Sequence, residues 1–352
     1  LQTSSREESH GWDIGPAERV IPQRALVLGA GLAGSFTARA LARRGIEVTV
    51  LDAAGIASGG SGNEQGVLYT RLSRRHSPLV DFALQSYRHA LGVYREMFAS
   101  GRIASGSDGA LCGCFHQHAD EEELRALRPL LADVADFAQV LDAATANDLL
   151  GVEQSADGFW YPGSGWLHPP AVCRALLGAP GIDVREHCGP LNLAHKDGLW
   201  QARSGRELIA DAPCAIVATG VDAGTMPGLE WLPLQPIRGQ TSLLAASDAL
   251  SQLRAALCHD GYITPARAGT HCIGATFDPG DTAPTPRDAD HRLNLERLGE
   301  AVPGWRDELT ALETHSIEGR VGWRCASPDY LPVVGPAPDR EAFLEDFAAL
   351  RR

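Results

Sequence analysis

Three glycines near the start of the chain have the spacing of a phosphate-binding turn. They lie in the stretch Gly29-Ala30-Gly31-Leu32-Ala33-Gly34. At this spacing Gly29 permits a tight turn, Gly31 lets the backbone approach a pyrophosphate, and Gly34 lets a helix pack closely on a strand. The helix that follows would present unpaired N–H groups to the phosphates. The alternative is a tight turn that binds nothing, which three glycines alone do not exclude.

The segments around this turn supply the context that the glycines lack. An apolar run from Ala25 to Leu28 leads into the turn, a helical pattern covers Leu32 to Arg44, and a second run, Glu47 to Leu51, follows. The second run ends at Asp52, whose carboxylate is placed to accept hydrogen bonds from an adenosine ribose. Strand, glycine turn, helix, strand and acid together predict a dinucleotide-binding unit.

A second glycine-rich segment follows this unit. It reads Ala57-Ser58-Gly59-Gly60-Ser61-Gly62-Asn63-Glu64-Gln65-Gly66, which is too rich in glycine for regular structure and too polar for a core. We interpret it as a loop that contacts a ligand.

The rest of the chain predicts strands of two kinds. Gly181 to Val184 and Cys214 to Gly220 are typical of further strands in the nucleotide-binding sheet, which is therefore expected to be discontinuous in sequence. Between Pro227 and Arg324 the pattern changes to alternating runs, and this predicts a separate, antiparallel substrate domain. These runs are Gln240 to Leu244, Gly261 to Thr264 and Thr270 to Phe277, with a polar helix near Asp288 to Glu300.

Four potential metal ligands occur at every second position. They are Cys112, Cys114, His116 and His118. On a strand they would share one face, but a row of side chains on one strand does not converge on a tetrahedral ion, because metal sites gather ligands from more than one element. We therefore expect ordinary strand residues and no metal site.

The composition narrows the class of protein. A chain of 352 residues is long enough for two domains, and its formal net charge of −13 disfavours general nucleic-acid binding without excluding a local basic patch. The eight cysteines form no CxxC pair, so reduced thiols in a cytoplasmic enzyme are expected. Residues 1–22 are expected to be a linker, and no apolar run is long enough to span a bilayer.

Several longer motifs, taken in order, resemble those of a known family. They are GAGLAG, ASGGSGNEQGVLY, FWYPGSGWLHPPAVC, ATG, PIRGQ, GYITPARAGTHCIGATFD and GRVGWRCASPDYLPVVGP. Together they resemble the FAD-dependent oxidoreductase half of MnmC-type enzymes, bifunctional proteins that modify the wobble uridine of tRNA. The resemblance runs from about Arg24 to Asp339. It extends more distantly to glycine oxidase, sarcosine oxidase and D-amino-acid oxidase.

This resemblance implies FAD as cofactor and a particular reaction. MnmC-type oxidases remove the carboxymethyl group from 5-carboxymethylaminomethyl-(2-thio)uridine at tRNA wobble position 34 and leave the 5-aminomethyl base. The arm is an N-substituted glycine, so hydride transfer to a flavin from the carbon between nitrogen and carboxylate gives an imine. Water then cleaves the imine to glyoxylate and the amine, and dioxygen is expected to reoxidise the flavin.

The resemblance also implies the fold. It predicts an α/β protein with a Rossmann-like FAD-binding domain and an inserted α+β antiparallel-sheet substrate domain, as in D-amino-acid oxidase. The FAD-binding domain would comprise residues 23–83, 159–225 and 326–352, and the substrate domain residues 84–158 and 226–325. Family members continue past the position of Arg352 into a strand, a glycine-rich turn and a helix whose positive end stabilises the anionic reduced flavin. The fold is thus expected to be C-terminally truncated. The expected protein partners of this chain are the missing C-terminal segment or a separate methyltransferase domain.

Individual residues acquire roles from the same resemblance. Gly29, Gly31 and Gly34 would contact the pyrophosphate and Asp52 the ribose. The remaining cofactor contacts would be Ser61, Gly62, Asn63 and Gln65 near the isoalloxazine ring, with Thr219 and Gly220 as a further contact.

Binding the substrate carboxylate calls for an arginine, whose planar fork can hold both oxygens. Arg324, in GWR, is the first candidate, and Tyr262, in GYITP, matches a tyrosine that shares this task. The alternatives are a surface ion pair for Arg324 and an ordinary strand aromatic for Tyr262. Arg238 and Arg320 are weaker candidates.

Three functions stay open on the sequence alone. The first is the tRNA-modifying oxidoreductase. The second is a free glycine- or sarcosine-type amino-acid oxidase, which shares the pocket but lacks a tRNA surface. The third is a truncated, non-catalytic fragment that binds tRNA or a partner. A basic run fits either a tRNA-phosphate surface or a solvated basic face: Arg71, Arg74, Arg75 and His76.

Overall fold

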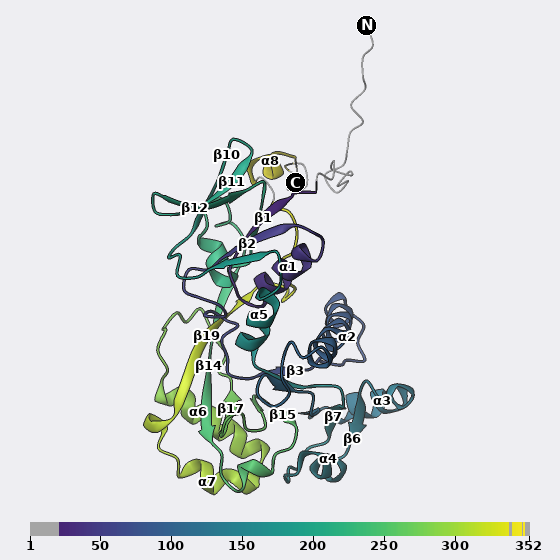
Figure 1. The fold of residues 1–352 in the computed structure, drawn as a ribbon. Coiled ribbons are helices and arrows are strands. Elements are labelled where there is room, and N and C mark those ends of the chain that lie inside the picture. Colours follow the sequence, from purple (N-terminus) through teal and green to yellow (C-terminus); the bar gives the residue numbers. More distant parts are fainter. Residues whose placement is uncertain (1–20, 338–339, 347, 349–352) are drawn as a thin grey trace.

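The computed structural model describes residues 21–337, 340–346 and 348, and Figure 1 shows the path of the chain. Most of the expected linker, residues 1–20, lies outside the described residues. A parallel sheet and a larger, mostly antiparallel sheet together position the candidate site.

The predicted strand, turn, helix and strand are confirmed. They form β1 (Arg24–Leu28), α1 (Leu32–Ala42) and β2 (Glu47–Leu51). The two additional strands expected in this sheet are also present, as β9 (Ile182–Arg185) and β13 (Cys214–Val217). The order is β13-β1-β2-β9 and every pair is parallel. The carboxyl ends of the strands therefore share the edge that carries the glycine turn, and the sheet is assembled from distant parts of the chain.

Both faces of the parallel sheet are covered, because β1 alternates its side chains between two layers. Ala25 and Val27 pack on the side of α1 and α5 (Pro169–Leu177), whereas Leu26 and Leu28 pack on the side of a three-stranded antiparallel sheet. The strands of that second layer are β10 (Asn192–Lys196), β11 (Leu199–Ser204) and β12 (Glu207–Ala212). Burial on both sides explains why β1 is an almost continuous apolar run.

A larger sheet fills the lower part of Figure 1. Its order is β18-β14-β17-β16-β15-β5-β7-β6, and β19 pairs with β14 along its length. The strands are β5 (Cys114–Gln117), β6 (Gln139–Leu141), β7 (Gly158–Tyr161), β14 (Gln235–Ala245), β15 (Ala256–Cys258), β16 (Tyr262–Ile263), β17 (Thr270–Gly274), β18 (Asp278–Pro279) and β19 (Glu318–Ala326). The expected antiparallel sheet is confirmed with one departure, since β15 and β5 run parallel.

Helices cover one face of this sheet. The polar helix expected near Asp288 to Glu300 is present as α6 (Asp288–Ala301), and α7 (Arg306–Thr310) follows it. Leu295 and Leu298 of α6 are buried in the same core cluster as Ile263 and Ile273 of the sheet. The helix is polar overall because only this one stripe faces the core.

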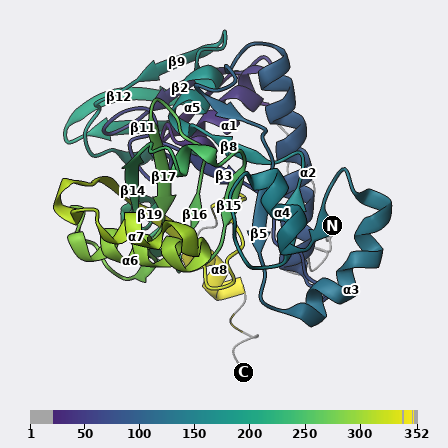
Figure 2. The same ribbon diagram turned by 90° about the horizontal axis from the view of Figure 1, so that it is seen from below.

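The remaining elements do not all lie on one side of the molecule, and α4 shares a core cluster with α6. Seen from below in Figure 2, α2 and α3 lie far from α6 and α7. These remaining elements are α2 (Pro78–Ala99), α3 (Glu121–Leu131), α4 (Ala143–Leu150), α8 (Arg340–Asp346), β3 (Gly66–Leu68), β4 (Gly109–Ala110) and β8 (Gly165–Leu167). Within the described part of the chain, no helix is both long and apolar enough to cross a membrane.

Among the strand limits that differ from expectation, two concern residues of the candidate site and of the Cys/His row. The run from Thr270 to Phe277 leaves the sheet after Gly274, so Thr276 and Phe277 lie in the connection to β18. The segment from Cys112 to His118 is a strand only at residues 114–117. The expected limits of the two domains stay predictions.

Candidate functional site

The glycine turn is closed by contacts that only glycine allows. Gly29 has φ +102°, and a Cβ there would overlap the carbonyl oxygen of Ala218, at the end of β13. A Cβ on Gly34 would overlap the carbonyl oxygen of Gly29, so helix and turn touch backbone to backbone. At Gly31 a Cβ would lie 3.0 Å from Oγ of Ser61, which brings the second glycine-rich segment against the turn.

Asp52 fastens the end of β2 to this turn. Its Oδ2 accepts the N–H of Ala30 at 2.7 Å, and its Oδ1 accepts the N–H groups of Gly55 and Ala54 at 2.8 and 3.0 Å. A carboxylate has about four acceptor positions, so the described residues occupy three and one is left on Oδ2. Asp52 therefore orders the turn itself and has one acceptor position left open on Oδ2.

Thr219 follows β13 beside the same turn. Its Oγ1 is buried and has no hydrogen-bond partner among the described residues. A buried hydroxyl without a partner costs about 1–3 kcal/mol, so a ligand that supplies the partner would be favoured here. Gly220 comes next with φ +60°, a left-handed conformation that favours glycine.

Arg320 of β19 holds the second glycine-rich segment in place. Its Nη1 donates to Oδ1 of Asn63 at 3.2 Å, and its Nη2 donates to the carbonyls of Ser58, at 2.8 Å, and Gly59. A Cβ on Gly62 would overlap the guanidinium, so this glycine makes room for the arginine. As a weaker candidate for carboxylate binding, Arg320 is thus already engaged with the loop.

Gln65 and Tyr262 fasten the other end of this segment. The buried Gln65 donates from its side-chain Nε2 to the carbonyl of Pro265 at 2.9 Å. The backbone carbonyl of Gln65 accepts the hydroxyl of Tyr262 at 3.2 Å. Burial raises the pKa of Tyr262 well above its ordinary value, so the hydroxyl is neutral and donates. Nearby, Oγ of Ser61 accepts the N–H of Leu32 at 3.0 Å. The loop is therefore fastened to α1, to β16 and to β19.

Arg324, at the far end of β19, faces a cleft of about 260 Å³. The cleft is lined by Ile237, Phe277, Arg324, Cys325, Ala326, Ser327, Tyr330, Leu331 and Pro332. The Arg324 Cζ lies 5.6 Å from the ring centroid of Phe277, and Nη1 donates to the carbonyl of Thr276 at 3.3 Å. A Cβ on Gly239 would lie 2.5 Å from Nη1, so the guanidinium occupies space that any side chain at position 239 would fill.

Arg324 and Tyr262, the two residues expected to bind the substrate carboxylate, lie near each other but do not line the same cleft. Burial lowers the pKa of Arg324, and Tyr262 and Tyr69 act on it in the opposite direction. These tyrosines are therefore its electrostatic neighbours. Tyr262 itself does not line the cleft of Arg324.

Strand register separates Arg238 from the cleft. In the antiparallel pair, Arg238 of β14 lies opposite Trp323, whereas Ile237 lies opposite Arg324. Directly opposed residues share a face, so Arg238 lies on the other face from Arg324. That face carries α6, and Nη1 of Arg238 donates to Oδ2 of Asp290 in α6 at 2.6 Å.

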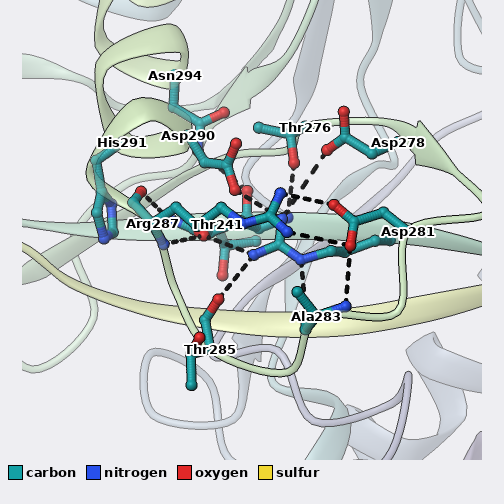
Figure 3. Close-up of polar contacts among 12 residues, drawn as sticks. Thr241, Thr276, Asp278, Asp281, Ala283, Thr285, Arg287, Asp290, His291 and Asn294 are labelled. Atoms are coloured by element: carbon teal, nitrogen blue, oxygen red, sulfur yellow. Dashed lines mark hydrogen bonds and ion pairs between the residues drawn. The ribbon is translucent and has the colours of Figure 1, made fainter.

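The Arg238 cluster binds a connection to the sheet. Figure 3 shows this connection at Asp281, Ala283 and Thr285, with Asp290 of α6 beside it. Arg238 is fully buried, and it also donates to the carbonyls of Ala283 and Thr285, each at 2.9 Å. Arg287 donates to Asp281 in the same connection. The cluster is structural, and it holds the chain that follows Phe277.

Two other groups of residues do not join the site. In the basic run, Arg74 pairs with Glu122 and Glu123, and Nε2 of His76 lies 2.9 Å from Oδ2 of Asp81, so two of the four side chains already contact acids. In the Cys/His row, Sγ of Cys114 lies 3.7 Å from Sγ of Cys258. Among the described residues, no group of three or more His, Cys, Asp or Glu could hold a metal ion.

Sequence reasoning missed Phe277, Thr276 and Gly239. All three lie in the motifs GATFD and PIRGQ, yet no residue pattern marks them individually. Their place beside Arg324 depends on how β14 and β19 are paired and on where β17 ends.

Comparisons with known proteins agree with this geometry. The profile of the FAD dependent oxidoreductase family matches residues 24–346. The tRNA 5-methylaminomethyl-2-thiouridine biosynthesis bifunctional protein MnmC of Stutzerimonas stutzeri is 40% identical over 100% of this chain and 53% of its own length. The protein of the same name from Pseudomonas entomophila is 38% identical over 97% of this chain and 52% of its own. The chain thus spans about half the length of these relatives.

Solved structures show the same fold. Glycine oxidase from Geobacillus kaustophilus has a TM-score of 0.73 at 22% identity, covering 90% of this chain and 87% of that one. Iminodiacetate oxidase from Chelativorans sp. BNC1 has a TM-score of 0.70 at 19% identity, with coverages of 90% and 87%. The fold is an FAD-binding Rossmann-like domain joined to a substrate domain, and the cofactor is FAD. This chain belongs to the FAD-dependent oxidoreductase family.

Proposed function

We propose that the chain catalyses the FAD-dependent oxidative removal of the carboxymethyl group from 5-carboxymethylaminomethyl-(2-thio)uridine at tRNA wobble position 34, giving the 5-aminomethyl base. Relatives named for the biosynthesis of 5-methylaminomethyl-2-thiouridine in tRNA support this, at 38 to 40% identity. The main support for this proposal is that, within the described part of the chain, the guanidinium of Arg324 is free to bind a carboxylate. Among the described residues no carboxylate pairs with Arg324, and its guanidinium donates a single hydrogen bond while facing a cleft.

The residues present fit the cofactor. The glycine turn would admit the pyrophosphate at Gly29, Gly31 and Gly34, the open acceptor of Asp52 suits a ribose hydroxyl, and the orphaned Thr219 hydroxyl lies beside them. The remaining proposed contacts are Ser61, Gly62, Asn63, Gln65 and Gly220. When bound, FAD supplies the acceptor for the hydride.

The side chains of this protein orient the substrate. Arg324 holds the carboxylate with two parallel N–H donors, which fixes the neighbouring carbon. Tyr262 keeps its neutral hydroxyl on the carbonyl of Gln65 and so couples β16 to the cofactor loop. We therefore propose Tyr262 as a residue that positions the cofactor loop beside the site.

The proposed partner is the modified tRNA. The relatives are called bifunctional and are about twice as long as this chain, so a methyltransferase domain is a proposed second partner.

The test uses the chain loaded with FAD and tRNA that carries 5-carboxymethylaminomethyl-2-thiouridine. We expect glyoxylate release and conversion to the 5-aminomethyl nucleoside, measured by mass spectrometry after digestion. Arg324→Ala should abolish turnover and retain FAD, whereas Arg292→Ala, on the exposed side of α6, should leave both unchanged. Turnover of free glycine or sarcosine without turnover of tRNA would instead identify an amino-acid oxidase. FAD binding with no turnover of any of them would identify a non-catalytic fragment.

A further inference from the structure

The cleft of Arg324 presents an aromatic side chain beside the cation. Phe277 is 49% exposed, although Arg324 lies next to its ring and a buried arginine cluster fixes the chain that follows. A large apolar side chain that is held in place yet left open to a cleft is a contact surface for a ligand.

A second aromatic lines the same cleft from a different segment. Tyr330 is 64% exposed and has φ +59°, a left-handed conformation that is rare for a bulky side chain. The turn around it is closed by hydrogen bonds from the N–H of Tyr330 to the carbonyl of Ser327 at 3.1 Å and from Oγ of Ser327 to the carbonyl of Leu331 at 2.6 Å. Unfavourable backbone held by its surroundings is often found at binding sites.

We infer that Phe277 and Tyr330 stack on the pyrimidine ring of the substrate while Arg324 holds its carboxylate. The two aromatics would then select a glycine linked to a base over a free one. This inference rests on the proposed function and adds the residues that recognise the base.

The dimensions of the substrate fit this arrangement. Four bonds separate the carboxyl carbon from ring carbon C5, and they span about 5 Å when extended. The guanidinium carbon of Arg324 lies 5.6 Å from the Phe277 ring centroid, so a ring at the end of the arm comes within reach of that aromatic. A wobble base that is turned out of its stack commonly lies against aromatic side chains.

Other features of the cleft point the same way. Arg324 makes no ion pair among the described residues, so it is available to an anion, and the rest of the lining is mostly apolar: Ile237, Ala326, Leu331 and Pro332. A free amino acid would use the cation alone. A base-linked glycine uses the cation and the apolar wall together.

The test compares two small ligands on the FAD-loaded chain. The probes are the nucleoside 5-carboxymethylaminomethyluridine and N-ethylglycine, which carries the same amine and carboxylate without the base. Their dissociation constants are obtained from how the rate of anaerobic flavin reduction saturates with the concentration of each probe. Phe277→Leu keeps an apolar side chain, and Tyr330→Asn suits the left-handed backbone. Phe82→Leu, at a 46% exposed aromatic on α2, is the matched control.

We expect Phe277→Leu and Tyr330→Asn each to weaken nucleoside binding about tenfold, in line with the loss of one stacking contact. Binding of N-ethylglycine should change less than about twofold, and the control should change neither. Equal weakening of both ligands would overturn the inference, because the aromatics would then only position Arg324. An unchanged nucleoside affinity would also overturn it. A parent chain that binds N-ethylglycine but not the nucleoside would overturn the proposed function itself.

Discussion

The guanidinium of Arg320 donates from Nη1 to Oδ1 of Asn63 at 3.2 Å, and this contact joins β19 to a loop 257 residues earlier in the chain. The same guanidinium bonds two backbone carbonyls of that loop, at Ser58 and Gly59. Three contacts from one charged group fix the loop in a single conformation, and this loop is the one we assign to the flavin ring.

Arg320→Gln should therefore weaken FAD binding. Hydrogen bonds to a charged group contribute about 1.5–3 kcal/mol each, so losing part of this set should raise the FAD dissociation constant by at least about tenfold. Fluorescence quenching of added FAD measures the constant. Arg320→Lys keeps the charge but not the planar fork, so its FAD dissociation constant should lie between those of the parent chain and Arg320→Gln. Arg292→Gln is the control, and equal FAD affinity in all variants would show that the loop does not need this arginine.

Substituting the buried Arg238 should lower the stability of the fold without a direct effect on the cleft of Arg324. Arg238 is fully buried and pairs with Asp290 at 2.6 Å. Removing one partner of a buried ion pair costs about 3–5 kcal/mol, because the other charge stays buried and unpaired. Arg238→Met should lower the free energy of unfolding in urea by that order. Arg287→Met, which breaks an exposed pair with Asp281, should have a much smaller effect. Similar losses in both variants would contradict the structural role of Arg238.

Local patterns predicted the elements that carry the cofactor turn. The strand, turn, helix and strand around Gly29, Gly31 and Gly34 form within about thirty residues, where side-chain period and turn chemistry decide the structure. Asp52 was expected at the end of the second strand, and it bonds the turn. Thr219 was named only through the family resemblance, and it lies beside the turn because β13 runs parallel to β1.

The three arginines show where sequence reasoning stopped. Arg238, Arg320 and Arg324 were all candidates for carboxylate binding, and all lie on one pair of strands. Their faces depend on the register between β14 and β19, which a shift of one residue would reverse. That register joins segments about eighty residues apart, so no local pattern reports it. The basic run has the same difficulty, because its acidic partners Glu122 and Glu123 come from α3.

The lowered pKa values of two buried histidines should make the stability of the fold depend on pH. Burial is the main cause that lowers the pKa values of His116 and His259 from 6.5 to about 4. Below pH 6.5 the unfolded chain binds a proton at each of them, whereas the folded chain binds it only near pH 4. Their contribution to stability is therefore fully present above pH 6.5 and decreases as the pH falls toward 4, by up to about 3 kcal/mol for each histidine.

His116→Gln and His259→Gln should each make the fall in stability shallower between pH 6.5 and 4.5, by up to about 1.4 kcal/mol per pH unit. Urea unfolding at several pH values measures the slope. His89→Gln, on the exposed side of α2, should leave the slope as it is. An unchanged slope in both buried variants would mean that other groups cause the acid sensitivity.

Gly239 predicts a change in substrate binding that leaves the cofactor site alone. A Cβ at this position would lie 2.5 Å from Nη1 of Arg324 and 3.0 Å from the carbonyl oxygen of Thr276, so Gly239→Ala must displace the guanidinium. The carboxylate binding that we propose for Arg324 depends on two donors held in one plane, and a shifted fork loses that match. We expect the dissociation constant of N-ethylglycine to rise about tenfold, the loss of one charge-assisted hydrogen bond, while FAD affinity stays within twofold. In Gly304→Ala, where a Cβ meets nothing within 4 Å, both constants should stay the same. If Gly239→Ala binds N-ethylglycine normally while Arg324→Ala does not, the position of the guanidinium tolerates displacement. If both bind it normally, the carboxylate is held elsewhere and Arg324 has no part in holding it.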